Sequence, residues 1–154
     1  MNSALGGRLR QLGIELPPPF QPVATYVGAV VVGDQIWVSG MGPTWDKEIR
    51  YRGKLGRDLT LEEGQQAARL TALNLLAHAV AAAGGADRVG PCLKLFGLVH
   101  SAPGFTDQHL VLNGASDLLG ALFPGSPHAR AAVAAPALPF SIAVELDGVF
   151  RLLP

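Results

Sequence analysis

The hydrophobic positions along the chain alternate between the spacing of strands and the spacing of helices. Residues 30–32 and 36–38 are short apolar runs on either side of Gly33-Asp34, a pattern that predicts two strands joined by a tight turn. Three further strands are predicted at residues 89–100, 130–134 and 141–150. Residues 89–100 are apolar on both faces, which favours a central place in a sheet.

Two longer segments carry apolar residues at helical spacing. The first, residues 60–84, starts with Thr60 and Glu63, which can form a capping box in which each side chain bonds the backbone amide of the other residue. Its inward face is rich in alanine and can therefore pack close to a sheet. The second helix is expected at residues 106–123 and stops before Pro124. The apolar stripes of the two helices are Ala68, Ala72, Leu75, Ala79 and Ala82, and Val111, Ala115, Leu118 and Leu122.

These elements occur in the order β-β-α-β-α-β-β. This order predicts an α/β (α+β) domain with a mixed sheet packed by two helices, and 154 residues fit one domain, 1–154. Residues 1–22 are expected to form a short amphipathic helix and a proline-rich extended connector. Residues 42–58, which are rich in glycine, proline and charge, are expected to form a surface loop or a short irregular strand.

Charge is scarce and balanced. Twelve basic and twelve acidic residues cancel, which argues against a nucleic-acid partner. Charged residues make up 16% of the chain, against about 25% in an ordinary soluble domain. So few charges leave apolar patches on a monomer, so we expect a homo-oligomer. We expect no membrane partner, because the sequence lacks an apolar stretch of 18 residues. The single cysteine and the lack of a secretory signal predict a cytoplasmic protein.

Most motifs that carry catalytic chemistry are missing. The glycine-rich segments lack the pattern of a phosphate-binding loop or a dinucleotide fingerprint. The four histidines and one cysteine do not have the spacing of a zinc site, so no metal or organic cofactor is predicted. His78 is expected at the surface or at an interface, and Cys92 is expected to be a small core residue rather than a nucleophile.

Arg130 and Glu145 are charges in apolar surroundings. Arg130 precedes the run Ala-Ala-Val-Ala-Ala, and Glu145 lies within Ile-Ala-Val-Glu-Leu. A charge within an apolar strand is costly to bury unless it is paired or used. A guanidinium can hold a carboxylate through two parallel hydrogen bonds, and a carboxylate can orient or deprotonate a water. The same residues also fit an Arg130–Glu145 salt bridge, or a Glu145 that faces solvent from an edge strand.

Residues 26–150 resemble the RidA/YjgF family of reactive-intermediate deaminase-like proteins. Residues 26–40, with Tyr26 at the start and Ser39-Gly40 at the end, resemble the first hairpin of that family, and residues 68–84 resemble its first long helix. The run Ala129-Arg-Ala-Ala-Val, followed by Leu138-Pro139 and Val144-Glu-Leu, resembles its C-terminal signature. The loop at 42–58 and residues 112–119 are similar to a longer, little-characterised branch of the family.

The resemblance implies a chorismate-mutase-like fold, assembled as a homotrimer with ligand clefts between subunits. It implies that Arg130 holds the carboxylate of a 2-imino acid and that Glu145 orients the hydrolytic water, without a metal or organic cofactor. Tyr26, Ser39 and Gly40 are expected to line the cleft, with Tyr26 coming from the same chain or from the neighbouring one. The implied reaction hydrolyses an enamine or imine to a keto acid and ammonia.

Two positions depart from the family pattern. Ala132 stands where the well-studied branch often has a cysteine, so the expected pocket floor differs. The asparagine on the family's second helix corresponds to Ser116, by counting back from Phe123, or to Asn113, about one turn earlier. Ser116, Asn113 and Ala132 are all candidate substrate-binding residues. Gly114 costs that helix about 1 kcal/mol, which indicates close packing or a ligand contact there.

Two functions from different classes follow. One is a trimeric imine or enamine deaminase, a hydrolase whose substrate is not assigned. The other is a non-catalytic trimer that binds a small carboxylate metabolite or a protein partner. Glu145 favours the enzyme, whereas Ala132 in place of the family cysteine favours the binding protein. Part of the family is also described as endoribonucleases. We rank this activity third for this chain, because its net charge is zero and it has no cluster of basic and aromatic residues.

Overall fold

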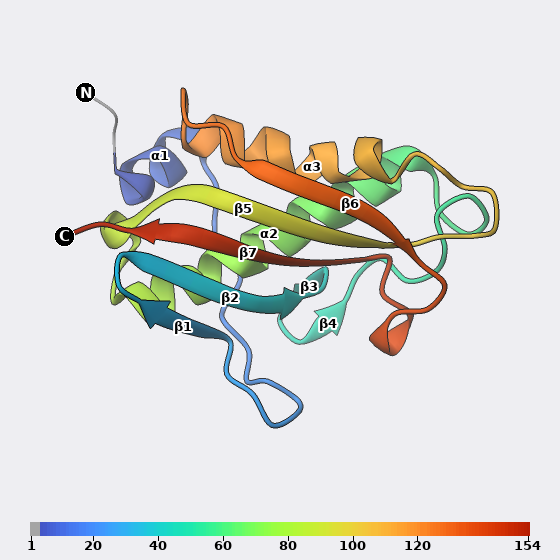
Figure 1. The fold of residues 1–154 in the computed structure, drawn as a ribbon, viewed down its shortest axis with the longest axis horizontal. Coiled ribbons are helices and arrows are strands. Elements are labelled where there is room, and N and C mark those ends of the chain that lie inside the picture. Colours follow the sequence, from blue (N-terminus) through green and yellow to red (C-terminus); the bar gives the residue numbers. More distant parts are fainter. Residues whose placement is uncertain (1–3) are drawn as a thin grey trace.

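The computed structural model describes residues 4–154 and contains a five-stranded mixed sheet with helices on one of its faces (Figure 1). The strands lie in the order β1-β2-β7-β5-β6, and all neighbours are antiparallel except the parallel pair β5 and β6. The element order and the mixed α+β architecture predicted from the sequence are confirmed. The strands are β1 (Ala29–Val32), β2 (Gln35–Met41), β5 (Val89–His100), β6 (Ala129–Ala135) and β7 (Val144–Leu152).

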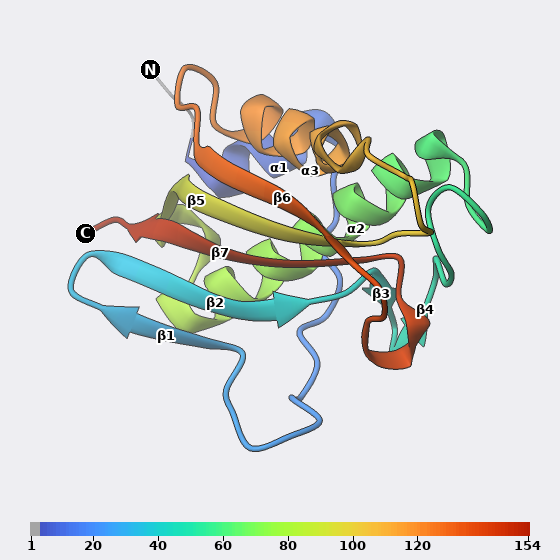
Figure 2. The ribbon, with the colours of Figure 1, turned by 45° about the vertical axis from the view of Figure 1, so that its right-hand side comes forward.

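Two long helices, α2 (Leu61–Ala83) and α3 (Gln108–Leu122), lie side by side behind the sheet (Figure 2). The predicted capping box starts α2: the Glu63 amide donates to Thr60 Oγ1 at 3.1 Å, and the Thr60 amide donates to the Glu63 carboxylate at 2.7 Å. A shorter helix, α1 (Leu5–Leu12), falls within the helix expected near the N-terminus and contacts α3 and the 3₁₀ helix η1 (Ala86–Arg88).

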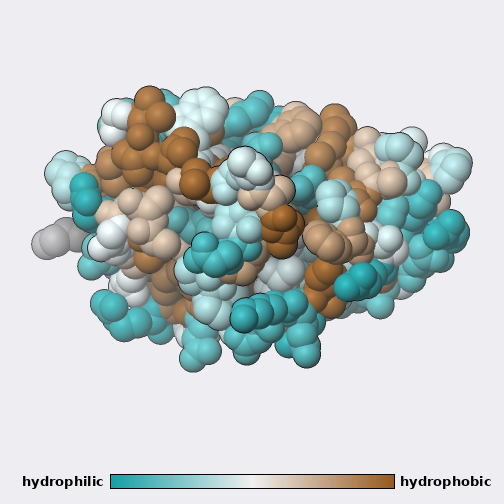
Figure 3. Space-filling model, turned by 90° about the horizontal axis from the view of Figure 1, so that it is seen from below, coloured by the Kyte–Doolittle hydropathy of each residue, from teal (hydrophilic) through white to brown (hydrophobic). Residues whose placement is uncertain are grey.

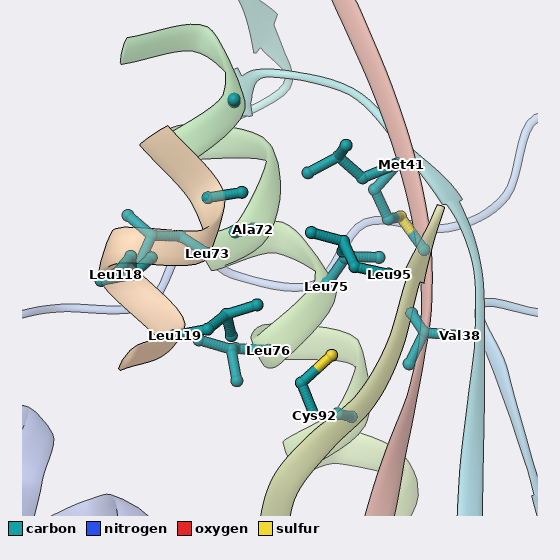
Figure 4. Packing of buried hydrophobic residues seen from close by; sticks show 14 of the residues in the cluster. Val38, Met41, Ala72, Leu73, Leu75, Leu76, Cys92, Leu95, Leu118 and Leu119 are labelled. Atoms are coloured by element: carbon teal, nitrogen blue, oxygen red, sulfur yellow. The ribbon is translucent and has the colours of Figure 1, made fainter. Parts of the chain in front are cut away.

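The hydrophobic core lies between the two long helices and the sheet (Figure 4). Leu75 of α2 packs toward Leu95 of β5 and Met41 of β2, while Leu73 and Leu119 lie between the helices. The alanine-rich face of α2 is buried as expected, except that Ala82 is exposed and the adjacent Ala83 is buried in its place. Burial raises the pKa of the Cys92 thiol to about 12, which confirms Cys92 as an unreactive core residue.

Gly114 is the point of closest approach between α2 and α3. A Cβ atom added there would overlap the backbone carbonyl oxygen of Gln65 on α2. The glycine therefore allows the helices to pack against each other, which supports the close-packing interpretation of this unfavourable helix residue.

Two expectations from the sequence are wrong. His78 is buried on α2, not at the surface: its ring packs edge-on against Phe20 with centroids 5.2 Å apart, and a Cβ on Gly28 would overlap it. The last strand starts at Val144 rather than Ser141. Pro139–Ser141 instead forms the 3₁₀ helix η2, where Phe140 and Ser141 both have a left-handed φ of 57° that a strand does not allow.

Residues 42–58 contain a small hairpin within the expected loop. Its strands are β3 (Thr44–Trp45) and β4 (Glu48–Ile49). The turn residues Asp46 and Lys47 have φ values of 49° and 67°, the left-handed conformation that a two-residue hairpin turn requires.

The second face of the sheet carries no helix within residues 4–154. Trp37 on β2 pairs with Val30 and with Val149, and it is 50% exposed on this face. Figure 3 views the molecule from below and shows hydrophobic side chains gathered in its upper part, with hydrophilic ones along its lower margin. Strand register places Val30, Trp37 and Val149 on this face beside the charged Lys94, Glu145 and Asp147, so its surface is mixed. The expected homo-oligomer stays a prediction.

Candidate functional site

Arg130 lies on β6, the edge strand of the sheet. The parallel register pairs Arg130 with Leu95 of β5, whose side chain is fully buried beneath the helices. Residues paired across neighbouring strands point to the same face, so Arg130 also points to the helix side. Because β6 has no further neighbour within the sheet, the long side chain of Arg130 can reach past the strand to α3.

Neutral oxygen atoms hold the Arg130 guanidinium. Nη1 donates to Ser116 Oγ at 3.0 Å, and Nη2 donates to the backbone carbonyl of His109 at 2.8 Å. The ion pairs found within residues 4–154 are Arg50–Glu48, Arg57–Asp58 and Arg151–Asp34. Arg130 and Glu145 therefore form no salt bridge with each other, and the positive charge of Arg130 is not neutralised in this part of the chain.

His128 extends this network. Its Nε2 lies 2.8 Å from Ser116 Oγ. Because that hydroxyl already accepts a hydrogen bond from Arg130, its own proton is free to be donated to His128. Burial, and secondarily the nearby charge of Arg130, lower the pKa of His128. The imidazole is therefore neutral at physiological pH and can accept this bond at Nε2.

A cavity of about 420 Å³ opens beside this network, between α3 and the start of β6. Its volume is within the usual range for small-molecule pockets. Its lining contains both candidates for the family's helix asparagine, Asn113 and Ser116, so the structure brings these two together with Arg130. The lining residues are Asn113, Ser116, Gly120, Phe123, Gly125, Ser126, Pro127, His128 and Arg130.

Glu145 lies on β7 and faces the other side of the sheet. It pairs with Leu98 of β5, which in turn pairs with Val133 of β6, three positions after Arg130. Because side chains alternate along a strand, Val133 and Glu145 share one face and Arg130 lies on the opposite one. Burial, and secondarily the neighbouring carboxylate of Asp147, raise the pKa of Glu145.

Of the other predicted residues of the cleft, Gly40 lies against Glu145. A Cβ on Gly40 would lie 2.9 Å from Oε1 of Glu145, so the glycine lets the carboxylate approach the β2 backbone. Ser39 Oγ donates to the carbonyl of Val27 at 2.6 Å and ties β2 to the segment that carries Tyr26, which is 46% exposed. The structure thus brings Asn113 and Ser116 together with Arg130, and Gly40 together with Glu145, at two separate places in one chain.

Ala132 joins neither group. It pairs with Gly97 and is partly buried against the core cluster, and it does not line the cavity beside Arg130. His128, by contrast, was not among the predicted site residues. Its place two positions before Arg130, at the spacing of strand residues that share a face, was the signal that could have indicated it.

Metal and membrane functions find no support in the described part of the chain. Residues 4–154 contain no group of three or more histidine, cysteine, aspartate or glutamate side chains placed to hold a metal ion. Likewise, none of the described helices is both long and apolar enough to cross a membrane.

Known proteins are similar to this chain in sequence and fold. The family model described as "YjgF/chorismate mutase-like, putative endoribonuclease" matches residues 6–149. TCP17 of Trypanosoma cruzi is 43% identical over 150 residues, or 96% of this chain and 94% of that protein. The structure of Atu1372 from Agrobacterium tumefaciens, of unknown function, is 39% identical with a TM-score of 0.87, covering 96% of this chain and 92% of that one. A Shewanella oneidensis protein with the same endoribonuclease description is 30% identical with a TM-score of 0.92, covering 97% and 100%. The chain therefore belongs to the YjgF/chorismate mutase-like family.

Proposed function

We propose that the protein binds 2-imino acids and hydrolyses them to keto acids and ammonia, in a cleft that two copies of the chain form together. Proteins of this family generally bind small molecules. The observation that carries the proposal is the guanidinium of Arg130, which lines a cavity of about 420 Å³ and has no acidic partner among residues 4–154.

The substrate's carboxylate would bind to Arg130. Nη1 and Nη2 each use one N–H on a neutral acceptor, Ser116 or His109, and the remaining N–H groups are left for a ligand. A half-buried cation held by neutral oxygen atoms favours an anion as its ligand. The planar fork of the guanidinium matches the two oxygens of a carboxylate, so the acid end of the substrate would be held in one orientation.

Glu145 would act on the water. Its raised pKa is that of a carboxylate in a poorly solvated place, which is the environment that makes a carboxylate a better proton acceptor. In the reaction a water oxygen bonds to the imine carbon, and Glu145 takes a proton from that water. Glu145 passes that proton to the nitrogen, and the second proton of the water follows as the C–N bond breaks, so the nitrogen leaves as ammonia and a keto acid remains.

The site would need two copies of the chain because its two halves do not face each other. Arg130 points to the helix side of the sheet, whereas Glu145 points to the side that no helix covers within residues 4–154. If a second copy packs its Arg130 edge against the Glu145 face of the first, both groups can reach one substrate. A trimer closed by rotation would repeat this cleft at each of its interfaces.

A non-catalytic, carboxylate-binding protein is the second candidate. It is favoured by the separation of Glu145 from Arg130 within one chain, because Arg130 and its cavity could bind an acid without Glu145. Such a protein would bind keto acids and their imines alike and release the imine unchanged. Measurements of imine hydrolysis separate the two candidates.

The test is an imine-trapping assay. An amino acid oxidase generates 2-iminopropanoate from alanine at a fixed rate, and semicarbazide traps the imine that has not been hydrolysed. We expect the protein to reduce trapping in proportion to its concentration. Arg130→Ala and Glu145→Gln should not reduce it, whereas the control Arg151→Ala, which removes an arginine paired with Asp34, should behave as wild type. Trapping unchanged by wild-type protein would leave only the binding function.

A further inference from the structure

We infer that His128 and Ser116 make the cavity beside Arg130 selective for carboxylates that carry a second, neutral hydrogen-bonding group, such as an amide or a hydroxyl. This inference names the substrate class of the proposed site, and it rests on the proposed role of Arg130 as the carboxylate anchor. It concerns a single chain, because all of the lining residues come from α3, β6 and the segment between them.

Ser116 ties His128 to the Arg130 network. Arg130 can only donate, so Ser116 Oγ accepts from it, and Ser116 Oγ also shares a hydrogen bond with Nε2 of His128. In a neutral imidazole one ring nitrogen donates and the other accepts. His128 therefore offers a neutral hydrogen-bonding ring, and no charge, to the cavity that it lines.

Two further polar side chains line the same cavity. The structure records no side-chain hydrogen bond for Asn113 or Ser126 among residues 4–154, so their polar groups are available to a ligand. An amide both donates and accepts, and so does a hydroxyl. Together with the neutral imidazole of His128, these groups form a wall that contains donors and acceptors. A ligand amide or hydroxyl can both donate hydrogen bonds to this wall and accept them from it.

A ligand whose second group is an alkyl chain or a second carboxylate fits this cavity less well. An alkyl group would displace water from Asn113, Ser126 and His128 without replacing its hydrogen bonds, and an unpaired polar group is costly. A second carboxylate would need a second cation. Arg130 is the only permanently charged residue in the lining, and the lowered pKa of His128 keeps the imidazole neutral. A dianion would therefore lose hydration without gaining an ion pair.

Three stable acids of nearly the same shape test this selectivity by calorimetry at neutral pH. Succinamate ends in an amide, 4-methylpentanoate in an isopropyl group and succinate in a second carboxylate. We expect succinamate to bind about tenfold more tightly than either of the others, the usual scale for unpaired polar groups in a binding site. Equal affinity for succinamate and 4-methylpentanoate, or tighter binding of succinate, would overturn the inference.

Variants at His128 assign the selectivity to this residue. His128→Phe keeps a ring but removes both nitrogens, and the preference for succinamate over 4-methylpentanoate should fall to about twofold or less. His128→Gln keeps a neutral donor and acceptor and should retain most of the preference. If His128→Phe binds the three acids as wild type does, His128 does not determine specificity.

The outcomes also separate this inference from the proposed function. If all three acids bind equally well and Arg130→Ala abolishes their binding, the anchor is supported and the selectivity is wrong. If succinamate is preferred but imines are not hydrolysed, the selectivity stands and the catalytic proposal is wrong. If none of the acids binds, both the anchor and the selectivity are wrong.

Discussion

Arg130 and Glu145 project from opposite faces of one sheet. Arg130 pairs with the fully buried Leu95, whereas Glu145 pairs with Leu98, three positions further along the same strand. The pleat of a strand sends residues separated by an odd number to opposite faces. The two residues therefore cannot meet on one ligand within one chain, and the proposed chemistry depends on a second copy.

This relationship predicts complementation between two inactive variants. Arg130→Ala and Glu145→Gln should each leave about 1% or less of wild-type imine hydrolysis when purified alone. When the two are co-expressed so that they assemble together, some clefts receive Arg130 from one copy and Glu145 from the other. With random mixing in a closed ring, about a quarter of the clefts would be intact, so about a quarter of wild-type activity should return.

The control for complementation mixes the two purified variants under conditions in which their assemblies do not exchange subunits. This mixture should stay inactive in the imine-trapping assay. If co-expression restores no activity although size-exclusion chromatography and mass measurements show mixed assemblies, the cleft does not combine Arg130 and Glu145 from different copies.

The anchor role of Arg130 predicts that its shape matters as well as its charge. Arg130→Ala should weaken succinamate binding by about 100-fold, the scale of a bidentate charge-assisted contact. Arg130→Lys keeps the charge but cannot form the two parallel bonds, so it should still lose about tenfold. Isothermal titration calorimetry measures both, and equal affinities of wild type and Arg130→Lys would contradict a bidentate contact.

The main elements of the fold could be predicted because their signals are local. The capping box at Thr60 and Glu63, the turn at Gly33 and the apolar period of α3 each lie within a few residues, and each appears in the structure as expected. The start of the last strand and the burial of His78 could not be predicted in this way. The first depends on left-handed residues that are not glycine, and the second on packing against Phe20 from a distant segment.

The candidate site shows the same division. Arg130 and Glu145 stand out in the sequence because each is a charge in an apolar run. Their placement on opposite faces depends on strand register, because a shift of one residue in β6 would move Arg130 to the same face as Glu145. The Arg130–Ser116–His128 network joins α3 to β6, so it could be found only once the helix and the edge strand were placed side by side.

Glu145 is expected to cost the protein stability while it supports activity. Glu145→Gln removes a partly buried carboxylate beside Asp147 and should reduce imine hydrolysis by about 100-fold, the scale of general base catalysis. At pH 8 the variant should melt at a higher temperature than wild type, by less than about 4 °C, the shift that 1 kcal/mol produces in a chain of this size. Thermal unfolding followed by circular dichroism measures the difference.

The pH dependence of this difference has a definite sign. The pKa of Glu145 is raised in the folded state from its ordinary value of 4.5, so the ionised carboxylate is less favourable folded than unfolded. The stability cost is present above the raised pKa and is relieved as pH falls through it. The melting temperatures of wild type and Glu145→Gln should therefore converge toward pH 4.5. Hydrolysis should fall in the same range, since protonated Glu145 cannot accept a proton, and a difference that grows on acidification would contradict the raised pKa.

Two glycines on α3 provide a matched test of helix packing. At Gly114 a Cβ would overlap the carbonyl oxygen of Gln65, whereas at Gly120 no atom lies within 4 Å of an added Cβ. Gly114→Ala should therefore force α2 and α3 apart and destabilise the fold by about 1–3 kcal/mol, the usual cost of overpacking. Gly120→Ala should stabilise it by about 0.5–1 kcal/mol, because alanine favours a helix. Denaturant unfolding of both variants measures the contrast. Equal stabilities would mean that α3 tolerates a side chain at Gly114, in which case the helices do not touch there as closely as the structure indicates.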